Sequence, residues 1–176
     1  MKILIVEDEK LARKSLEKQI LSLRPKTEIL AQLESVQETV DWLKKNEADL
    51  LFLDIHLANG DGFQVLESLK NKRQNVIFVT GHEEHAVKAF RSEAVDYLLK
   101  PVCIEHLQGA VERVRTRTSS DKNEGKSQIS LSHIYFKEDD FHQMLPNNPQ
   151  LFSRTNHLKS RQQLCDRKNE KQTFFV

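Results

Sequence analysis

The sequence Leu-Leu-Phe-Leu-Asp at residues 50–54 is a short apolar run that ends in a carboxylate, and Ile-His-Leu-Ala-Asn-Gly-Asp-Gly follows it at residues 55–62. An unbroken apolar run of this length is typical of a strand buried on both faces of a parallel sheet, and Asn, Gly and Asp are typical of the turn that ends it. The pattern therefore predicts a central strand whose end presents the carboxylate of Asp54 at the edge of the sheet.

Three other apolar runs also end in polar residues. Glu7 and Asp8 follow the first run of the chain. Thr80 ends a later run, and Lys100 follows the last one. An isolated buried carboxylate is costly, and open parallel sheets bind ligands outside the carboxyl ends of their strands. We therefore expect these residues to form one site with Asp54.

The intervening segments have apolar residues at helical spacing, so the chain alternates strand and helix. We expect strands at residues 2–6, 27–33, 50–53, 76–80 and 96–99. We expect helices at residues 10–23, 35–46, from 63 into the polar residues 71–75, 83–90 and 103–117. Five strands alternating with five helices predict a doubly wound α/β fold with a parallel sheet and right-handed crossovers.

Length and composition set limits on function. The 176 residues suffice for one domain of ordinary size and an appendage, and the net charge of +1 does not favour binding to nucleic acid or to a membrane. The N-terminus has no signal-peptide pattern, and no apolar run is long enough to span a bilayer. We expect a cytoplasmic protein without membrane insertion.

The polar residues at the strand ends occur in the order found in a known family. They are Glu7-Asp8, Asp54, Thr80, Tyr97 and Lys100-Pro101. With these residues, and with Gly62 in the loop, residues 1–117 resemble a response-regulator receiver domain of the flavodoxin-like fold. Residues 89–101 are similar to receivers that precede LytTR-type DNA-binding domains.

The resemblance implies that Asp54 accepts a phosphoryl group from a sensor histidine kinase. Three carboxylates at one edge would raise one another's pKa, which a divalent cation reverses, and Mg²⁺ suits a site that retains waters. By the family pattern Asp8 and Asp54 bind the ion directly, the backbone carbonyl of His56 adds an oxygen, and Glu7 acts through water.

The resemblance also implies roles for the later residues. Lys100 would neutralise a phosphoryl oxygen, and the Lys100-Pro101 bond would be cis. Thr80 would bond the phosphoryl group and leave room for Tyr97 to swing in. The surface formed by the fourth helix, the fifth strand and the fifth helix would then change between two states, and a phosphorylation-dependent homodimer through it is plausible.

Two histidines near the site are expected to tune the phosphoryl lifetime. His56 and His82 lie two residues after Asp54 and Thr80, where the family controls the approach of water to the acyl phosphate. The reaction implied is phosphotransfer and autodephosphorylation, so we do not expect a turnover enzyme. A phosphatase with an aspartyl nucleophile usually has a second acid two residues later, where this chain has His56.

The rest of the chain is harder to assign. Residues 118–128 are polar and predict a linker, and residues 129–176 have too few regularly spaced apolar residues for a core. We interpret residues 129–176 as a short tail that is disordered or is the remnant of a LytTR-type DNA-binding domain. Two alternatives remain open: a transcription factor whose tail still binds DNA, and a stand-alone phosphate relay.

Overall fold

The computed structural model of the chain describes residues 1–69, 74–82 and 94–119. Its strands are β1 (Lys2–Val6), β2 (Glu28–Leu33), β3 (Leu50–Leu53), β4 (His56–Leu57), β5 (Gly60–Asp61), β6 (Val76–Thr80) and β7 (Asp96–Leu99). Its helices are α1 (Lys10–Leu23), α2 (Val36–Lys45), α3 (Gly62–Ser68) and α5 (Ile104–Ser119). The helix expected at residues 83–90 and nearly all of the linker and tail lie outside the described residues.

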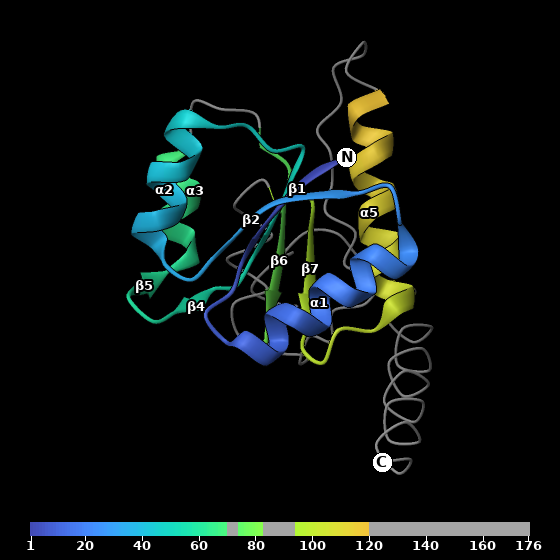
Figure 1. Cartoon of the computed structure of the whole chain (residues 1–176), viewed down its shortest axis with the longest axis horizontal. Helices are drawn as coiled ribbons and strands as arrows, with labels where there is room; N and C mark the ends of the chain where they lie inside the picture. The colour runs from blue at the N-terminus through green and yellow to red at the C-terminus, as the bar shows by residue number, and fades with distance from the viewer. Residues whose placement is uncertain (70–73, 83–93, 120–176) are drawn as a thin grey trace, which may run out of the picture.

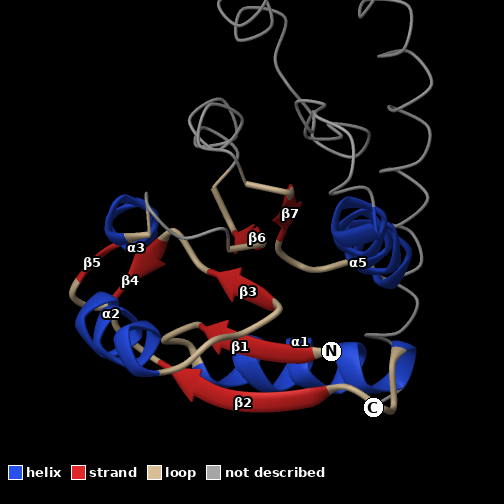
Figure 2. Ribbon diagram, turned by 90° about the horizontal axis from the view of Figure 1, so that it is seen from above, coloured by secondary structure: helices blue, strands red, loops and turns tan. Residues whose placement is uncertain are grey.

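The main sheet has five parallel strands in the order β2-β1-β3-β6-β7. This is the strand order of flavodoxin-like folds, so the predicted doubly wound α/β architecture is confirmed. Figure 1 shows α1 and α5 together on one side of the sheet and α2 and α3 on the other, and Figure 2 shows the same separation from above.

The alternation of side chains along each strand builds a core on both faces of the sheet. On β1, Ile3 and Ile5 pack in a cluster with residues of α1 and α5, whereas Leu4 and Val6 pack in a cluster with residues of α2 and α3. All four residues of β3 are buried, as expected for a strand covered on both faces. The central strands therefore hold the loops at their ends on a rigid support.

The boundaries of most elements agree with the sequence. The bounds of β1 and α1 are those expected, β2 starts one residue later, and α5 runs to Ser119, two residues past the expected end. Ser35 caps α2 by accepting a hydrogen bond from the backbone N–H of Glu38 at 3.2 Å, as the capping pattern predicts. The carboxylate of Glu38 accepts from the N–H of Glu34 instead of from Ser35, so the capping box is shifted by one residue.

The segment after β3 is more ordered than the turn-rich loop that the sequence suggests. β4 and β5 form a small antiparallel hairpin in which His56 pairs with Asp61. At its tip, the side-chain oxygen of Asn59 accepts a hydrogen bond from the N–H of Val36 at 3.1 Å. The hairpin is thereby attached to the first turn of α2. Within the residues that the structure describes, no helix is both long and apolar enough to cross a membrane.

Candidate functional site

The central position of β1 and β3 brings the predicted acids together. The N–H of Asp54 donates to the carbonyl of Val6 at 2.9 Å, which continues the β1–β3 pairing to the end of both strands. The N–H of Glu7 donates in the same way to the carbonyl of Leu33 at 2.9 Å. Glu7 and Asp54 are both buried, while Asp8 is half-buried. The sheet itself therefore places the acids that follow neighbouring strands side by side.

Lys100 joins two of these acids. Its Nζ lies 2.6 Å from Oδ2 of Asp54 and 2.6 Å from Oε2 of Glu7. Its backbone N–H donates to the carbonyl of Thr80 at 2.9 Å, so the end of β6 holds the base of the lysine. The expected cis Lys100-Pro101 bond is present. The sequence predicted that Lys100 lies at this site but not that it bonds two carboxylates at once.

Burial and charge act in opposite directions on the ionisable groups of this cluster. Burial raises the pKa of Glu7, and the nearby charge of Asp54 raises it further, against the lowering effect of its bond to Lys100. Burial lowers the pKa of Lys100, but its bonds to Asp54 and Glu7 outweigh burial, so the net direction is upward. Lys100 is therefore held in its charged form, whereas the carboxylate form of Glu7 is destabilised.

The donor set suits a hard divalent cation. Glu7, Asp8 and Asp54 each offer a carboxylate oxygen, and these atoms all lie within 4.8 Å of one another. Carboxylate oxygens are ligands that Mg²⁺ prefers, and a cation would also relieve the burial of negative charge on Glu7. His56 is placed beside the cluster because its N–H donates to Oδ1 of Asp54 at 3.2 Å. The role of its backbone carbonyl as a metal ligand stays a prediction.

Gly62 is required by the close approach of two backbone segments. A Cβ at this position would lie 2.3 Å from the carbonyl oxygen of Asp54 and 3.2 Å from Cα of Ile55. The N–H of Gly62 instead donates to the carbonyl of Ile55 at 2.7 Å. The start of α3 therefore packs directly under the backbone of Asp54, which explains in physical terms the glycine that the family pattern includes.

Thr80 and Tyr97, the two expected switch residues, lie on the neighbouring strands β6 and β7, with Thr80 at the end of β6 and Tyr97 paired with Phe78. Thr80 is fully buried, and its hydroxyl oxygen finds no hydrogen-bond partner among the described residues. Buried polar atoms are rarely left unpaired, so this oxygen is a candidate to bond an incoming group. The Tyr97 ring is buried, lies 6.3 Å from the ring of Phe78, and its hydroxyl donates to the carbonyl of His82. The switch role of Tyr97 stays a prediction.

The two histidines expected to tune lifetime contact each other. The rings of His56 and His82 are stacked, with centroids 4.0 Å apart and an interplanar angle of 15°. Both residues are exposed, and each lies two residues after Asp54 or Thr80, His56 at the start of β4. The sequence placed each of them near the site, but it had no signal for the stacking of two residues so far apart in the chain.

The sequence analysis missed Arg13, which lies in the first part of α1. One of its terminal nitrogens donates to the backbone carbonyl of Glu7 at 2.5 Å, and the other lies 2.6 Å from Oε1 of Glu34. The only signal in the sequence is a basic residue about one helical turn after the acidic pair. That signal does not distinguish Arg13 from its basic neighbours Lys10 and Lys14.

Comparison with known proteins agrees with this geometry. The family model of the response regulator receiver domain matches residues 3–112. The chain is 37% identical over 142 residues to the sensory transduction protein LytR of Staphylococcus epidermidis, covering 80% of this chain and 56% of that protein. It is 35% identical over 125 residues to the transcriptional regulatory protein LytR of Staphylococcus aureus (strain N315), covering 70% of this chain and 50% of that protein.

A solved structure shares the fold. The response regulatory domain of protein mrkE from Klebsiella pneumoniae has a TM-score of 0.62 and 31% sequence identity, covering 68% of this chain and 98% of that chain. The similarity to solved structures is thus to a whole receiver domain. The chain spans about half the length of the curated relatives it matches.

Proposed function

The chain belongs to the response-regulator receiver family, and on that premise we propose that Asp54 accepts a phosphoryl group from a phosphohistidine of a sensor kinase. The observation that carries this proposal is the cluster of Glu7, Asp8 and Asp54 around Lys100 at the ends of β1, β3 and β7. Phosphoryl transfer depends mainly on positioning and on neutralising charge, and this cluster offers groups for both.

Asp54 is the nucleophile in the proposed step. A carboxylate oxygen of Asp54 attacks phosphorus, the P–N bond to the imidazole of the kinase breaks, and its electron pair leaves with the imidazole, which is then protonated. The N–H of His56 and the ammonium of Lys100 fix the two oxygens of Asp54, so the carboxylate is oriented before the phosphodonor arrives.

The remaining residues of the cluster hold the transferred group. A bound Mg²⁺ supplies positive charge to the phosphoryl oxygens, and Glu7, Asp8 and Asp54 are the side chains that would hold it. The ammonium of Lys100 would give up its bond to Asp54 and neutralise another phosphoryl oxygen. The buried hydroxyl of Thr80 is placed to donate a hydrogen bond once the group is attached.

The stacked histidines support a role in the lifetime of the acyl phosphate. We expect His56→Ala and His82→Ala each to change the rate of autodephosphorylation without abolishing phosphorylation, because the stacked rings belong to the segments that follow Asp54 and Thr80. The measurement is the loss of phosphoryl group with time after removal of the phosphodonor. Unchanged rates in both variants would contradict this role.

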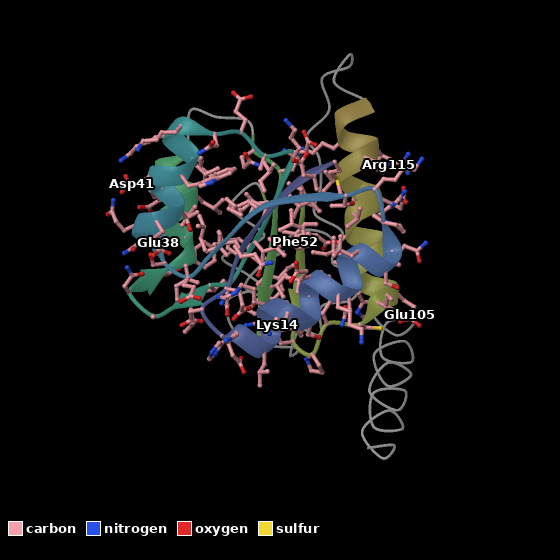
Figure 3. The ribbon with its side chains drawn as sticks, in the orientation of Figure 1. Lys14, Glu38, Asp41, Phe52, Glu105 and Arg115 are labelled. Carbon is pink, nitrogen blue, oxygen red and sulfur yellow. The ribbon has the colours of Figure 1, made fainter. Side chains whose placement is uncertain are left out.

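Mg²⁺-dependent uptake of phosphate tests the main proposal. The full chain is incubated with acetyl phosphate, with MgCl₂ or with EDTA, and the intact mass is measured. We expect one phosphoryl group per chain only with Mg²⁺, and none in Asp54→Asn. Asp41→Asn is the matched control because Asp41 is a partly exposed carboxylate on α2, away from the cluster (Figure 3). Uptake by Asp54→Asn equal to that of the Asp41→Asn control would refute the proposal.

A second candidate function is DNA binding by residues outside the receiver. One of the relatives is named a transcriptional regulatory protein. The 142-residue match to the Staphylococcus epidermidis protein is longer than the 3–112 family match, so it extends outside that region. A sequence-specific, salt-dependent shift of promoter DNA would support this function, and the absence of any shift at low salt would count against it.

The cellular context follows from the proposed kinase partner. Phosphate transfer from a sensor kinase implies that the chain acts in the cytoplasm, and the reaction proposed is a stoichiometric transfer, not turnover of a substrate.

A phosphorylation-dependent homodimer is also part of the proposal. Size-exclusion chromatography with light scattering, before and after treatment with acetyl phosphate, distinguishes a dimer from a monomer.

A further inference from the structure

Arg13 connects three segments that surround the acidic cluster. It lies in the first part of α1, where its backbone N–H donates to the carbonyl of Glu9 at 3.0 Å. Its side chain is only 11% exposed, which is low for an arginine near the start of a surface helix. The guanidinium reaches back from α1 to the loop after β1 and across to the residue that follows β2.

The bond to the backbone of Glu7 is the important one. A terminal nitrogen of Arg13 donates to the Glu7 carbonyl at 2.5 Å, and the N–H of Glu7 is already bonded to Leu33. The peptide that joins Glu7 to Asp8 is planar, so fixing its oxygen fixes the direction in which the chain enters Asp8. The bond from Arg13 therefore restrains the backbone between two of the three acids that would hold a cation.

The bond to Glu34 holds the guanidinium of Arg13 in position. The Glu34 side chain is 60% exposed, so its ion pair with Arg13 contributes little stability by itself. The N–H of Glu34 donates to the carboxylate of Glu38 at 3.1 Å, which anchors this residue to the first turn of α2. A planar guanidinium holds two acceptors in fixed directions, which a lysine ammonium does not.

We infer that Arg13 is a positioning residue for the cation site, acting through the Glu7 carbonyl to hold the acids in the arrangement that binds Mg²⁺. The inference rests on the proposed function, because it presumes that the cluster binds this ion. Residues that orient metal ligands typically change metal affinity by about 10- to 100-fold when they are replaced.

Charge and positioning predict opposite results for Arg13→Gln. Removing a positive charge close to three carboxylates should strengthen cation binding if only the electrostatic field matters. Loss of the hydrogen bond from Arg13 to the Glu7 carbonyl should weaken cation binding. Lys14→Gln is the matched control, because it removes one positive charge from an exposed position of the same helix (Figure 3).

The test is a titration of the full chain with MgCl₂, in which isothermal titration calorimetry measures the Kd. We expect Arg13→Gln to raise the Kd for Mg²⁺ by about tenfold relative to wild type. Lys14→Gln should leave it unchanged or lower it. Urea unfolding without Mg²⁺ shows that each variant is folded. Arg13→Lys keeps the charge but loses the planar guanidinium that bonds two acceptors at once, so it should give an intermediate Kd. This variant replaces Arg13→Gln in the test if Arg13→Gln does not fold.

The outcomes separate this inference from the proposed function. A wild-type chain that binds Mg²⁺ while Arg13→Gln binds it as tightly as Lys14→Gln overturns the positioning role and leaves the cation site standing. A wild-type chain that does not bind Mg²⁺, or one that binds it no more tightly than Asp8→Asn does, overturns the cation site and the role of Arg13 with it.

Discussion

Each end of strand β7 has a basic side chain that contacts a buried carboxylate. The two ends differ in the number of acids that the basic side chain contacts. At its first residue, Asp96 is 0% exposed and bonds Arg113 of α5, whose side chain is 27% exposed. Just past its last residue, Lys100 bonds both Glu7 and Asp54. At Asp96, the ion pair joins one base to one acid. The Lys100 cluster sets one charge against two acids and has Asp8 beside them.

This difference separates a structural contact from a chemical site. The Asp96–Arg113 pair joins α5 to the sheet, and burial lowers the pKa of Arg113, the expected effect of a low-dielectric setting on a cation. At the other end, burial raises the pKa of Glu7, and the bond to Lys100 does not fully offset this effect. An excess of negative charge on one rigid edge is costly unless a cation binds there.

Breaking the balanced pair should have the largest effect on stability. Asp96→Ala leaves the partly buried guanidinium of Arg113 without this carboxylate, and we expect a loss of about 3 kcal/mol in the free energy of unfolding. Urea unfolding measures the loss. The loss relative to wild type should be the same with and without MgCl₂, because the proposed cation site lies at the opposite end of the strand and is intact in this variant. A loss relative to wild type that shrinks with MgCl₂ would show that the two ends are coupled and would contradict the comparison.

Breaking the unbalanced cluster should cost less and should respond to Mg²⁺. Lys100→Gln removes the ammonium from Glu7 and Asp54, and we expect a loss of about 2 kcal/mol without Mg²⁺. Without the ammonium, the acids should bind Mg²⁺ more tightly than they do in wild type, so the loss relative to wild type should shrink when MgCl₂ is added. A loss that is equal with and without MgCl₂ would contradict the cation site.

A third prediction concerns the close packing of Gly62 against the backbone of Asp54. Gly62→Ala places a Cβ 2.3 Å from the carbonyl oxygen of Asp54, so the loop must move, at a cost of about 1.5 kcal/mol. We also expect slower phosphate uptake, because Asp54 shifts relative to Lys100. Gly81→Ala is the control, since a Cβ there meets no described residue within 4 Å. Equal stabilities for the two variants would rule out this close approach.

The smallest expected effect has the opposite sign. Thr80→Val removes a buried hydroxyl that has no hydrogen-bond partner among the described residues, and we expect stability to rise by about 1 kcal/mol. The same variant should take up phosphate but lose the phosphorylation-dependent change, which tryptic cleavage rates with and without acetyl phosphate can follow. A destabilised Thr80→Val would mean that the hydroxyl is paired in solution.

The sequence predicted the parts of the molecule that depend on local pattern. Strand ends are marked by the change from apolar to polar residues, which placed Asp54 and Lys100, and the family resemblance added Gly62 and the cis bond. The bonds between loops were not predictable, because they depend on side-chain directions that only the folded sheet sets. Lys100 bonding two acids, the His56–His82 stack and the Arg13 bond to Glu7 are of this kind.

The most direct test of the account locates the phosphoryl group on the chain. The protein is treated with acetyl phosphate and MgCl₂ and then with borohydride, which reduces an aspartyl phosphate to homoserine, and its peptides are sequenced by mass spectrometry. The account predicts homoserine at position 54 alone, and only when Mg²⁺ was present. Homoserine at another acidic residue, or none in a chain that has gained a phosphoryl group, would contradict it.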